Sequence, residues 1–247
     1  MRSVLKIYTS LLLQASFFTA ASLAATASDA KRANGFIDAN LYPYLANTGS
    51  DNFLSVLAAL TFGGRLSYFS LTNFGNFKGD GTVADRDTFY TEQNLRWRLS
   101  KTSPLDLTAQ LNFRSGSLND RYRFGIRWRL SDTEGFKPFF QSLNLTYSVN
   151  WHAVQIDHED AYVWQLEHAF KFVFPSISRR LYLAGFADHT FNQNLPATFP
   201  KNPIVGEVQL GYRLFDKMFA VAEYRVNQYR RGDVINFALG VEYKVSW

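Results

Sequence analysis

Arginines occupy positions of one phase, two or four residues apart where there are several, in three neighbouring segments of the sequence. In an extended chain, residues two apart lie on the same face, so each run of arginines projects from one side of its strand. Guanidinium groups carry a permanent charge and several N–H donors, so a surface built from them attracts and binds anions. The set consists of Arg96, Arg98, Arg114, Arg121, Arg123, Arg127 and Arg129.

Later segments carry carboxylates in the corresponding phase, mixed with Lys171, Arg213, Arg225 and Lys244. These carboxylates are Glu167, Glu207, Glu223 and Glu242. Two interpretations remain open. Either the charges pair across a narrow interior and stabilise it, or they create a transverse field that orients polar or anionic solutes in a water-filled pore.

Few residues could support catalysis. There is no cysteine, and the histidines are His152, His158, His168 and His189. Asp188 and His189 are adjacent and could act as acid and base. The nucleophile would be Ser142 or Ser148, and no spacing motif supports such a triad. The sequence therefore predicts that the protein is not an enzyme.

A metal site is equally weakly supported. His158, Glu159 and Asp160 could bind a metal together with His152, which is predicted to lie at an external strand end. A solvated external loop explains these residues better. We expect no metal and no cofactor.

The segments that carry these residues show a hydrophobic period of two. In residues 236–247, Phe237, Val241 and Trp247 share one face, and Glu242 and Lys244 share the other. The clear strands run about 10 to 14 residues, longer than strands of soluble sheets and long enough to cross a bilayer at a tilt. We expect strands near residues 36–45, 53–62, 65–74, 88–100, 104–115, 120–131, 138–152, 161–174, 180–190, 204–215, 218–228 and 234–247.

Composition supports this all-β interpretation. Of the 247 residues, 23 are Phe, 13 are Tyr and 5 are Trp, which suits the aromatic girdles of a membrane barrel. Beyond the N-terminus there is no apolar run of about 20 residues, as a transmembrane helix would need. The net charge of +5 includes Arg2 and Lys6 of the N-terminal segment, so the balance does not indicate a nucleic-acid partner.

Residues 1–27 have the features of a secretory signal peptide. Arg2 and Lys6 are followed by an apolar stretch, and Ala25-Thr26-Ala27 offers a cleavage site. A membrane anchor helix is the alternative, but polar residues interrupt the stretch. We therefore expect a mature chain of residues 28–247 that forms one transmembrane antiparallel β-barrel of about twelve strands.

The connections and the last strand agree with this topology. An even strand count places both termini in the periplasm, with short turns on that side and longer loops outside. The predicted turns at residues 63–64 and 216–217 are short, and the segments 75–87 and 191–203 are long. The chain ends on Trp247, with Tyr243 on the same face, which resembles the C-terminal signal read by the barrel assembly machinery.

Three stretches resemble the nucleoside-specific channel-forming (Tsx-like) family of outer-membrane proteins. They are residues 63–69 (GGRLSYF) with 71–74 (LTNF), residues 183–188 (LAGFAD), and residues 208–212 (VQLGY) followed by the Glu223 strand and Gly240-Val241. The resemblance implies a monomeric twelve-stranded barrel that admits nucleosides or similar small polar solutes. The arginine-rich wall departs from what a neutral nucleoside requires and is reminiscent of porins for acidic oligosaccharides.

We therefore expect a channel for passive uptake of small polar solutes in the bacterial outer membrane, in contact with its lipids. A porin for anionic solutes or acidic oligosaccharides is one alternative. A lipid-modifying enzyme or a purely structural barrel is the other.

Overall fold

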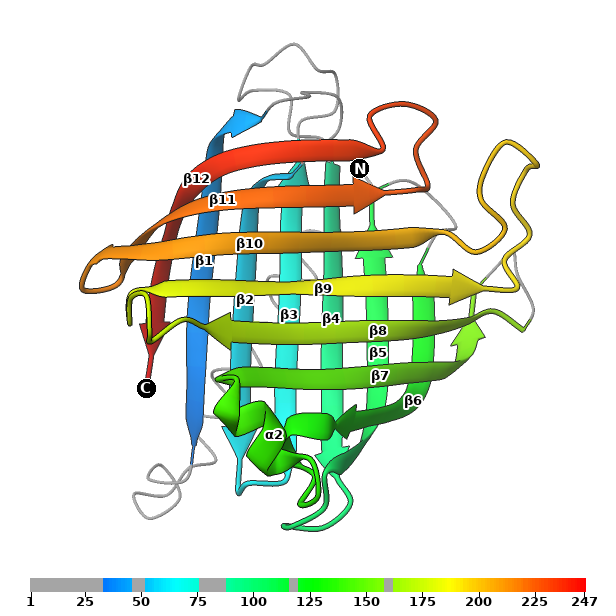
Figure 1. The fold of residues 1–247 in the computed structure, drawn as a ribbon. Coiled ribbons are helices and arrows are strands. Elements are labelled where there is room, and N and C mark those ends of the chain that lie inside the picture. Colours follow the sequence, from blue (N-terminus) through cyan, green and yellow to red (C-terminus); the bar gives the residue numbers. More distant parts are fainter. Residues whose placement is uncertain (1–32, 46–51, 76–87, 116–119, 158–161) are drawn as a thin grey trace.

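The computed structural model describes residues 33–45, 52–75, 88–115, 120–157 and 162–247, which form one closed β-barrel (Figure 1). The predicted signal peptide lies outside the described residues. The wall consists of twelve antiparallel strands: β1 Asn34–Leu45, β2 Asn52–Phe62, β3 Leu66–Gly75, β4 Thr88–Arg98, β5 Leu105–Arg114, β6 Arg121–Arg129, β7 Leu145–Ile156, β8 Trp164–Val173, β9 Leu181–Phe191, β10 Ile204–Phe215, β11 Met218–Asn227 and β12 Ile235–Ser246.

Each strand pairs with its neighbours in the sequence, and β1 pairs with β12 to close the barrel. At this seam the N–H of Gly35 donates to the carbonyl of Trp247 (3.0 Å), and the N–H of Trp247 donates to the carbonyl of Gly35 (3.1 Å). The first strand therefore begins where the last one ends, which confirms the even strand count. We call this end of the barrel the terminus side and the opposite end the loop side.

The strands are strongly tilted. In Figure 1, β8 to β12 on the near wall cross β1 to β5 on the far wall at a steep angle. Closure of a sheet into a barrel requires such tilt. Residues far apart in the sequence are thereby brought to the same level of the lumen.

The exposed part of the outer surface is largely apolar. On β6, the outward side chains Tyr122, Phe124, Ile126 and Trp128 are 40 to 49% exposed, whereas Arg123 on the inner face is 3% exposed. An apolar exterior around a polar interior is the pattern of a membrane-spanning barrel. Within the described residues, no helix is both long and apolar enough to cross a membrane.

Tight turns join strands on the terminus side. Gly63 and Gly64 connect β2 to β3 with φ values of 53° and 71°, a left-handed conformation that glycine adopts without a Cβ clash. Residues 216–217 connect β10 to β11, and Asp216 has a φ of 32°. On the loop side, residues 192–203 form a longer connection. These three connections follow the predicted alternation of short turns and long loops, whereas the terminus-side connection between β6 and β7, residues 130–144, is long.

The seventh strand was predicted to span residues 138–152, and this is wrong: β7 spans Leu145–Ile156. The residues before it form the 3₁₀ turn η2 (Leu130–Asp132) and the helix α2 (Lys137–Ser142), which has Pro138 in its first turn. Phe140 is buried because it stacks on Tyr147 at 6.1 Å between ring centroids. The other predicted strands differ from the observed ones by at most three residues at either end.

A β-bulge interrupts β7. Phe124 of β6 pairs with Val154, but the next residue, Gly125, pairs with His152, so Ala153 is an extra residue in β7. A bulge shifts the side-chain alternation of its strand by one position. Consequently, His152 and Gln155 both face the lumen although their numbers differ in parity.

Candidate functional site

The lumen contains two cavities that meet near the middle of the barrel. The cavity on the loop side has a volume of about 480 Å³, and the one on the terminus side has a volume of about 300 Å³. We call them the loop-side chamber and the terminus-side chamber. Both are lined by the same five residues at their junction, Leu71, Glu92, Phe186, Asp188 and Glu207.

Three of the predicted lumen arginines gather around one carboxylate on the terminus side. Asp106 is 1% exposed and lies directly opposite Arg127 in the β5–β6 register. It accepts hydrogen bonds from Arg127 Nε (2.8 Å) and Nη2 (2.5 Å) and from Arg129 Nη1, and Arg98 Nε lies 4.0 Å away. Arg129 also pairs with the exposed Asp132 at 2.7 Å. This cluster is a structural ion-pair network at the barrel wall.

Arg96 belongs to a second group in the lumen. Its Nη2 lies 3.7 Å from Glu167 Oε1, and the other oxygen of Glu167 lies 3.1 Å from His152 Nε2. His152 is fully buried and also contacts the amide of Asn150 at 3.0 Å. The sequence had suggested an external strand end for His152, and this is wrong because β7 continues past it to Ile156.

The other three arginines, Arg114, Arg121 and Arg123, line the loop-side chamber. Arg121 Nε lies 3.7 Å from Asp157. Arg123 donates from Nε to Gln155 Oε1 (2.7 Å) and from Nη1 to Gln110 Oε1 (2.9 Å). Within the described residues, neither Arg114 nor Arg123 forms an ion pair. The seven arginines are thus divided between two ends of the lumen, and only those on the loop side include unpaired cations.

Sequence reasoning missed several partners of these arginines. Gln155 and Asp157 had been assigned to an external loop, and the bulge in β7 turns Gln155 inward. Asp106 and Gln110 share the inward phase of Arg114, so the alternation was visible in the sequence. Their specific partners depend on the pairing register, which the sequence did not provide.

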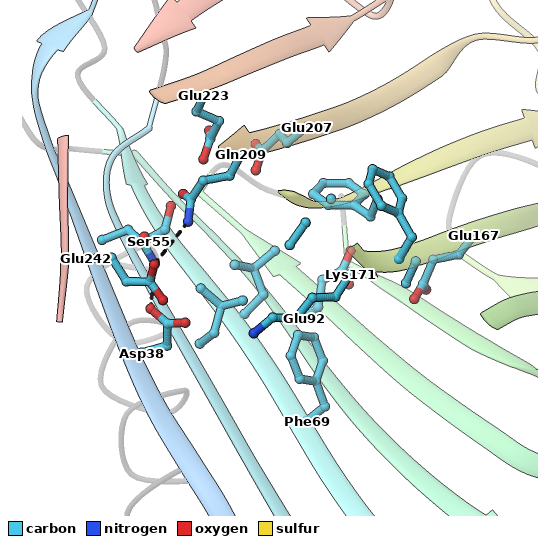
Figure 2. A pocket seen from close by; sticks show the side chains of 18 of the residues that line it. Asp38, Ser55, Phe69, Glu92, Glu167, Lys171, Glu207, Gln209, Glu223 and Glu242 are labelled. Carbon is cyan, nitrogen blue, oxygen red and sulfur yellow. Dashed lines mark hydrogen bonds between the residues drawn. The ribbon is translucent and has the colours of Figure 1, made fainter. Parts of the chain in front are cut away.

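Tyr182 and Lys244 hold two carboxylates of the terminus-side chamber. Glu242 accepts a hydrogen bond from the hydroxyl of Tyr182, and its second oxygen lies 3.6 Å from Lys244 Nζ. Lys244 also pairs with Asp38 at 2.5 Å. Figure 2 shows Asp38 and Glu242 side by side. These carboxylates therefore have partners on the barrel wall.

Glu223 and Glu207 enter the lumen from the neighbouring strands. Glu223 is 4% exposed, accepts a hydrogen bond from the hydroxyl of Tyr42 and pairs with Arg225. Glu207 lines both chambers at their junction, and Figure 2 shows it next to Glu223 along the wall. All four predicted lumen carboxylates thus line the terminus-side chamber.

The junction between the chambers has carboxylates on opposite walls. Glu92 comes from β4, and Asp188 comes from β9. Glu92 accepts hydrogen bonds from the neutral donors Tyr90, Gln110 (3.2 Å) and Asn112 (3.4 Å). Within the part of the chain that the structure describes, neither Glu92 nor Asp188 forms an ion pair. The junction of the two chambers therefore has carboxyl groups on both walls.

Cations cover the faces of several lumen aromatics. Arg225 lies 4.5 Å from the ring centroid of Tyr42, and Arg114 lies 5.5 Å from that of Tyr90. Arg96 and Phe69 show the same arrangement at 5.3 Å. These cation–π contacts stabilise the cations. They also occupy the ring faces on which a planar solute would stack.

The loop connecting β11 to β12 contributes a neutral hydroxyl to the loop-side chamber. Tyr229 lines this chamber and donates to Gln193 Oε1 at 2.5 Å. Burial raises the pKa of Tyr229 above its usual value, so its hydroxyl stays protonated at neutral pH.

The residues considered for catalysis do not come together. Asp188 lines both chambers, whereas its neighbour His189 lies on the outer face against Phe191, with ring centroids 4.2 Å apart. Adjacent residues of a strand point to opposite faces, so this acid and base cannot share one site. Ser142 ends α2 outside the lumen. Three of the residues considered for a metal, His158, Glu159 and Asp160, lie outside the described residues.

The proposed assembly signal lies at the outer surface of the closing strand. Tyr243 is 48% exposed and Trp247 is 52% exposed. The backbone of Trp247 pairs with Gly35 across the seam, as described above. Both aromatic rings are therefore accessible from outside the barrel.

No family model and no curated protein sequence matches this chain. The resemblance to the nucleoside-channel family therefore stays a prediction. Among solved structures, the KdgM porin aligns with a TM-score of 0.47 and 12% identity, covering 85% of this chain and 98% of that chain. The NanC porin aligns with a TM-score of 0.50 and 13% identity, covering 86% of this chain and 100% of that chain. The likeness to NanC shows that this chain has the fold of a small outer-membrane porin.

Proposed function

We propose that the protein is an outer-membrane channel for passive uptake of small polar solutes, with a preference for solutes that carry an anionic group. The observation that carries this proposal is the polar lumen, in which two cavities meet inside an apolar barrel wall. Charges without an ion-pair partner are unfavourable in a sealed protein interior, and a hydrated pore supplies water and counterions to them. Within the described residues, Arg114 and Arg123 are such charges.

The preference for an anionic group rests on the loop-side chamber. Solutes that enter from outside meet this chamber first, and Arg114, Arg121 and Arg123 give it a positive wall. A local field of one sign raises the concentration of oppositely charged solutes at a pore entrance. Nucleosides are a less favoured class of solute, because cations already cover the faces of Tyr42, Phe69 and Tyr90 on which a base would stack.

Planar-bilayer conductance tests the proposal. Refolded residues 28–247 should give step-like currents. In a salt gradient, the reversal potential should show selectivity for anions. Galacturonate and uridine, added to the loop side, should be compared as current blockers. Folded protein that never conducts would leave a structural barrel, and release of fatty acid from the bilayer would identify a lipid-modifying enzyme.

A further inference from the structure

The loop-side chamber holds charges of both signs. Arg114, Arg121 and Arg123 line its wall, and Glu92, Asp188 and Glu207 lie where it meets the other chamber. Arg114 is directly opposite Tyr90 in the β4–β5 register, and Glu92 is two residues further along β4. Two residues of a strand span about 7 Å. This spacing separates Arg114 from Glu92 along the barrel wall, whereas Arg123 lies opposite Gln110 in the β5–β6 register.

A neutral amide lies between Arg123 and Glu92. Gln110 accepts a hydrogen bond from Arg123 Nη1 (2.9 Å) and donates one from Nε2 to Glu92 Oε2 (3.2 Å). Arg123 and Glu92 are therefore bridged by an amide and do not contact each other. Both groups remain available to a solute inside the chamber.

Several buried polar atoms that line the same chamber have no hydrogen-bond partner within the described residues. Asn73 is 6% exposed, and its Oδ1 is unpartnered; Gln165 is 2% exposed, and its Nε2 is unpartnered. Arg114 Nε, Arg225 Nη2 and Asp188 Oδ1 are also unpartnered. Buried polar groups nearly always have partners, so five such atoms around one cavity indicate that a polar molecule completes them. Three of them are donors and two are acceptors.

We propose that the loop-side chamber is a binding site for amphoteric solutes, with an anionic group held by Arg114 and Arg123 and an ammonium group held by Glu92 and Asp188. This rests on the proposed channel function and names the class of solute. The cavity of about 480 Å³ is within the size range of small-molecule sites. The two charged groups of the solute lie about 7 Å apart, and its middle carries amides or hydroxyls that meet Asn73 and Gln165.

Glycylglycine and two derivatives test this assignment, because all three have the same backbone. Glycylglycine is a zwitterion whose ends lie about 7 Å apart when extended. Acetylation of its amine leaves only the anion, and amidation of its carboxylate leaves only the cation. Each compound is titrated into planar bilayers as a current blocker at low salt. Equilibrium binding to the folded barrel in detergent micelles is measured in parallel by calorimetry.

Glycylglycine should bind at least about tenfold more tightly than either derivative, since one charge-assisted contact is lost in each. The Glu92→Gln/Asp188→Asn double variant should bind glycylglycine no more tightly than the acetylated form. The Arg114→Gln/Arg123→Gln double variant should bind glycylglycine no more tightly than the amide. Glu134→Gln removes a negative charge and Lys137→Gln removes a positive charge, each at an exposed position outside the lumen. Both control variants should still bind glycylglycine more tightly than either derivative.

The outcomes separate this inference from the channel function. A conducting barrel that binds the three compounds equally, in bilayers and in micelles, overturns the amphoteric site and leaves the channel standing. A barrel that does not conduct but binds glycylglycine selectively in micelles supports the site and overturns the channel. Circular dichroism of each variant shows whether the barrel is folded before binding is compared.

Discussion

Gly125 of β6 packs its bare Cα against the carbonyl of Trp151 in β7, where a Cβ atom would lie 1.8 Å from the carbonyl oxygen. The contact arises at the bulge that turns His152 and Gln155 toward the lumen. Gly125 is therefore required at the bulge, which turns Gln155 inward to accept a hydrogen bond from Arg123.

Replacing Gly125 by Ala should destabilise the barrel by about 3 kcal/mol, the upper part of the range for overpacking, because the clash is with backbone. Unfolding by urea in detergent micelles, followed by tryptophan fluorescence, measures the change. Gly135→Ala is the matched control, since no atom lies within 4 Å of the added methyl group. Equal stability of both variants would contradict a strict requirement for glycine at the bulge.

Asp106→Asn should also destabilise the barrel by about 3 kcal/mol, because it leaves Arg127 and Arg129 without their shared counterion. Asp132→Asn removes an exposed partner of Arg129 and should change stability by less than about 1 kcal/mol. The same urea titration compares them. A harmless Asp106→Asn substitution would show that water, not this carboxylate, stabilises the arginine cluster.

Arg114→Gln/Arg123→Gln should shift the reversal potential toward cations in a salt gradient, because these arginines lack carboxylate partners. The shift should become small at 1 M salt, where the Debye length is about 3 Å. Arg127→Gln should shift it less, since Asp106 already neutralises that charge. Unchanged selectivity in the conducting double variant would leave these arginines with a structural role alone.

Removal of Trp247 should lower the fraction of chains that reach the folded, heat-modifiable form in the outer membrane. The expected cause is the loss of an exposed aromatic residue that the assembly machinery reads, together with two backbone hydrogen bonds to Gly35. Trp247→Ala retains the backbone bonds and separates these contributions. Phe215→Ala, at another exposed aromatic, is the control, and equal yields for all variants would refute the signal.

The sequence was most informative where polar and apolar residues alternate without interruption. In β6 and β12 the period of two predicted both the strand and the face of each side chain. Prediction failed around β7 for two local reasons. Phe139 and Phe140 are adjacent aromatics in a helix and obscured the start of the strand, and Ala153 at the bulge reversed the phase beyond it.

The residues of β3 do not show which face of the strand points into the lumen. Phe69 and Leu71 line the lumen, whereas Thr72, in the opposite phase, is buried opposite Thr91 of β4. The two threonine hydroxyls lie 2.8 Å apart, and Gln93 donates to Thr91 at 2.7 Å. Cross-strand hydrogen bonds thus make buried polar residues tolerable in this phase, and they depend on pairing with β4. Likewise, the alternation assigns a phase to each arginine but does not indicate which of them lack a counterion.

The seam between Gly35 and Trp247 joins residues separated by almost the whole length of the chain. Such a pairing carries the largest loop-closure entropy of the fold and gains nothing until the intervening strands are in register. Sealing of the barrel is therefore expected to be the last and slowest step of its formation. Until then, β1 and β12 present open edges that can pair with other chains, so aggregation competes with folding at this step.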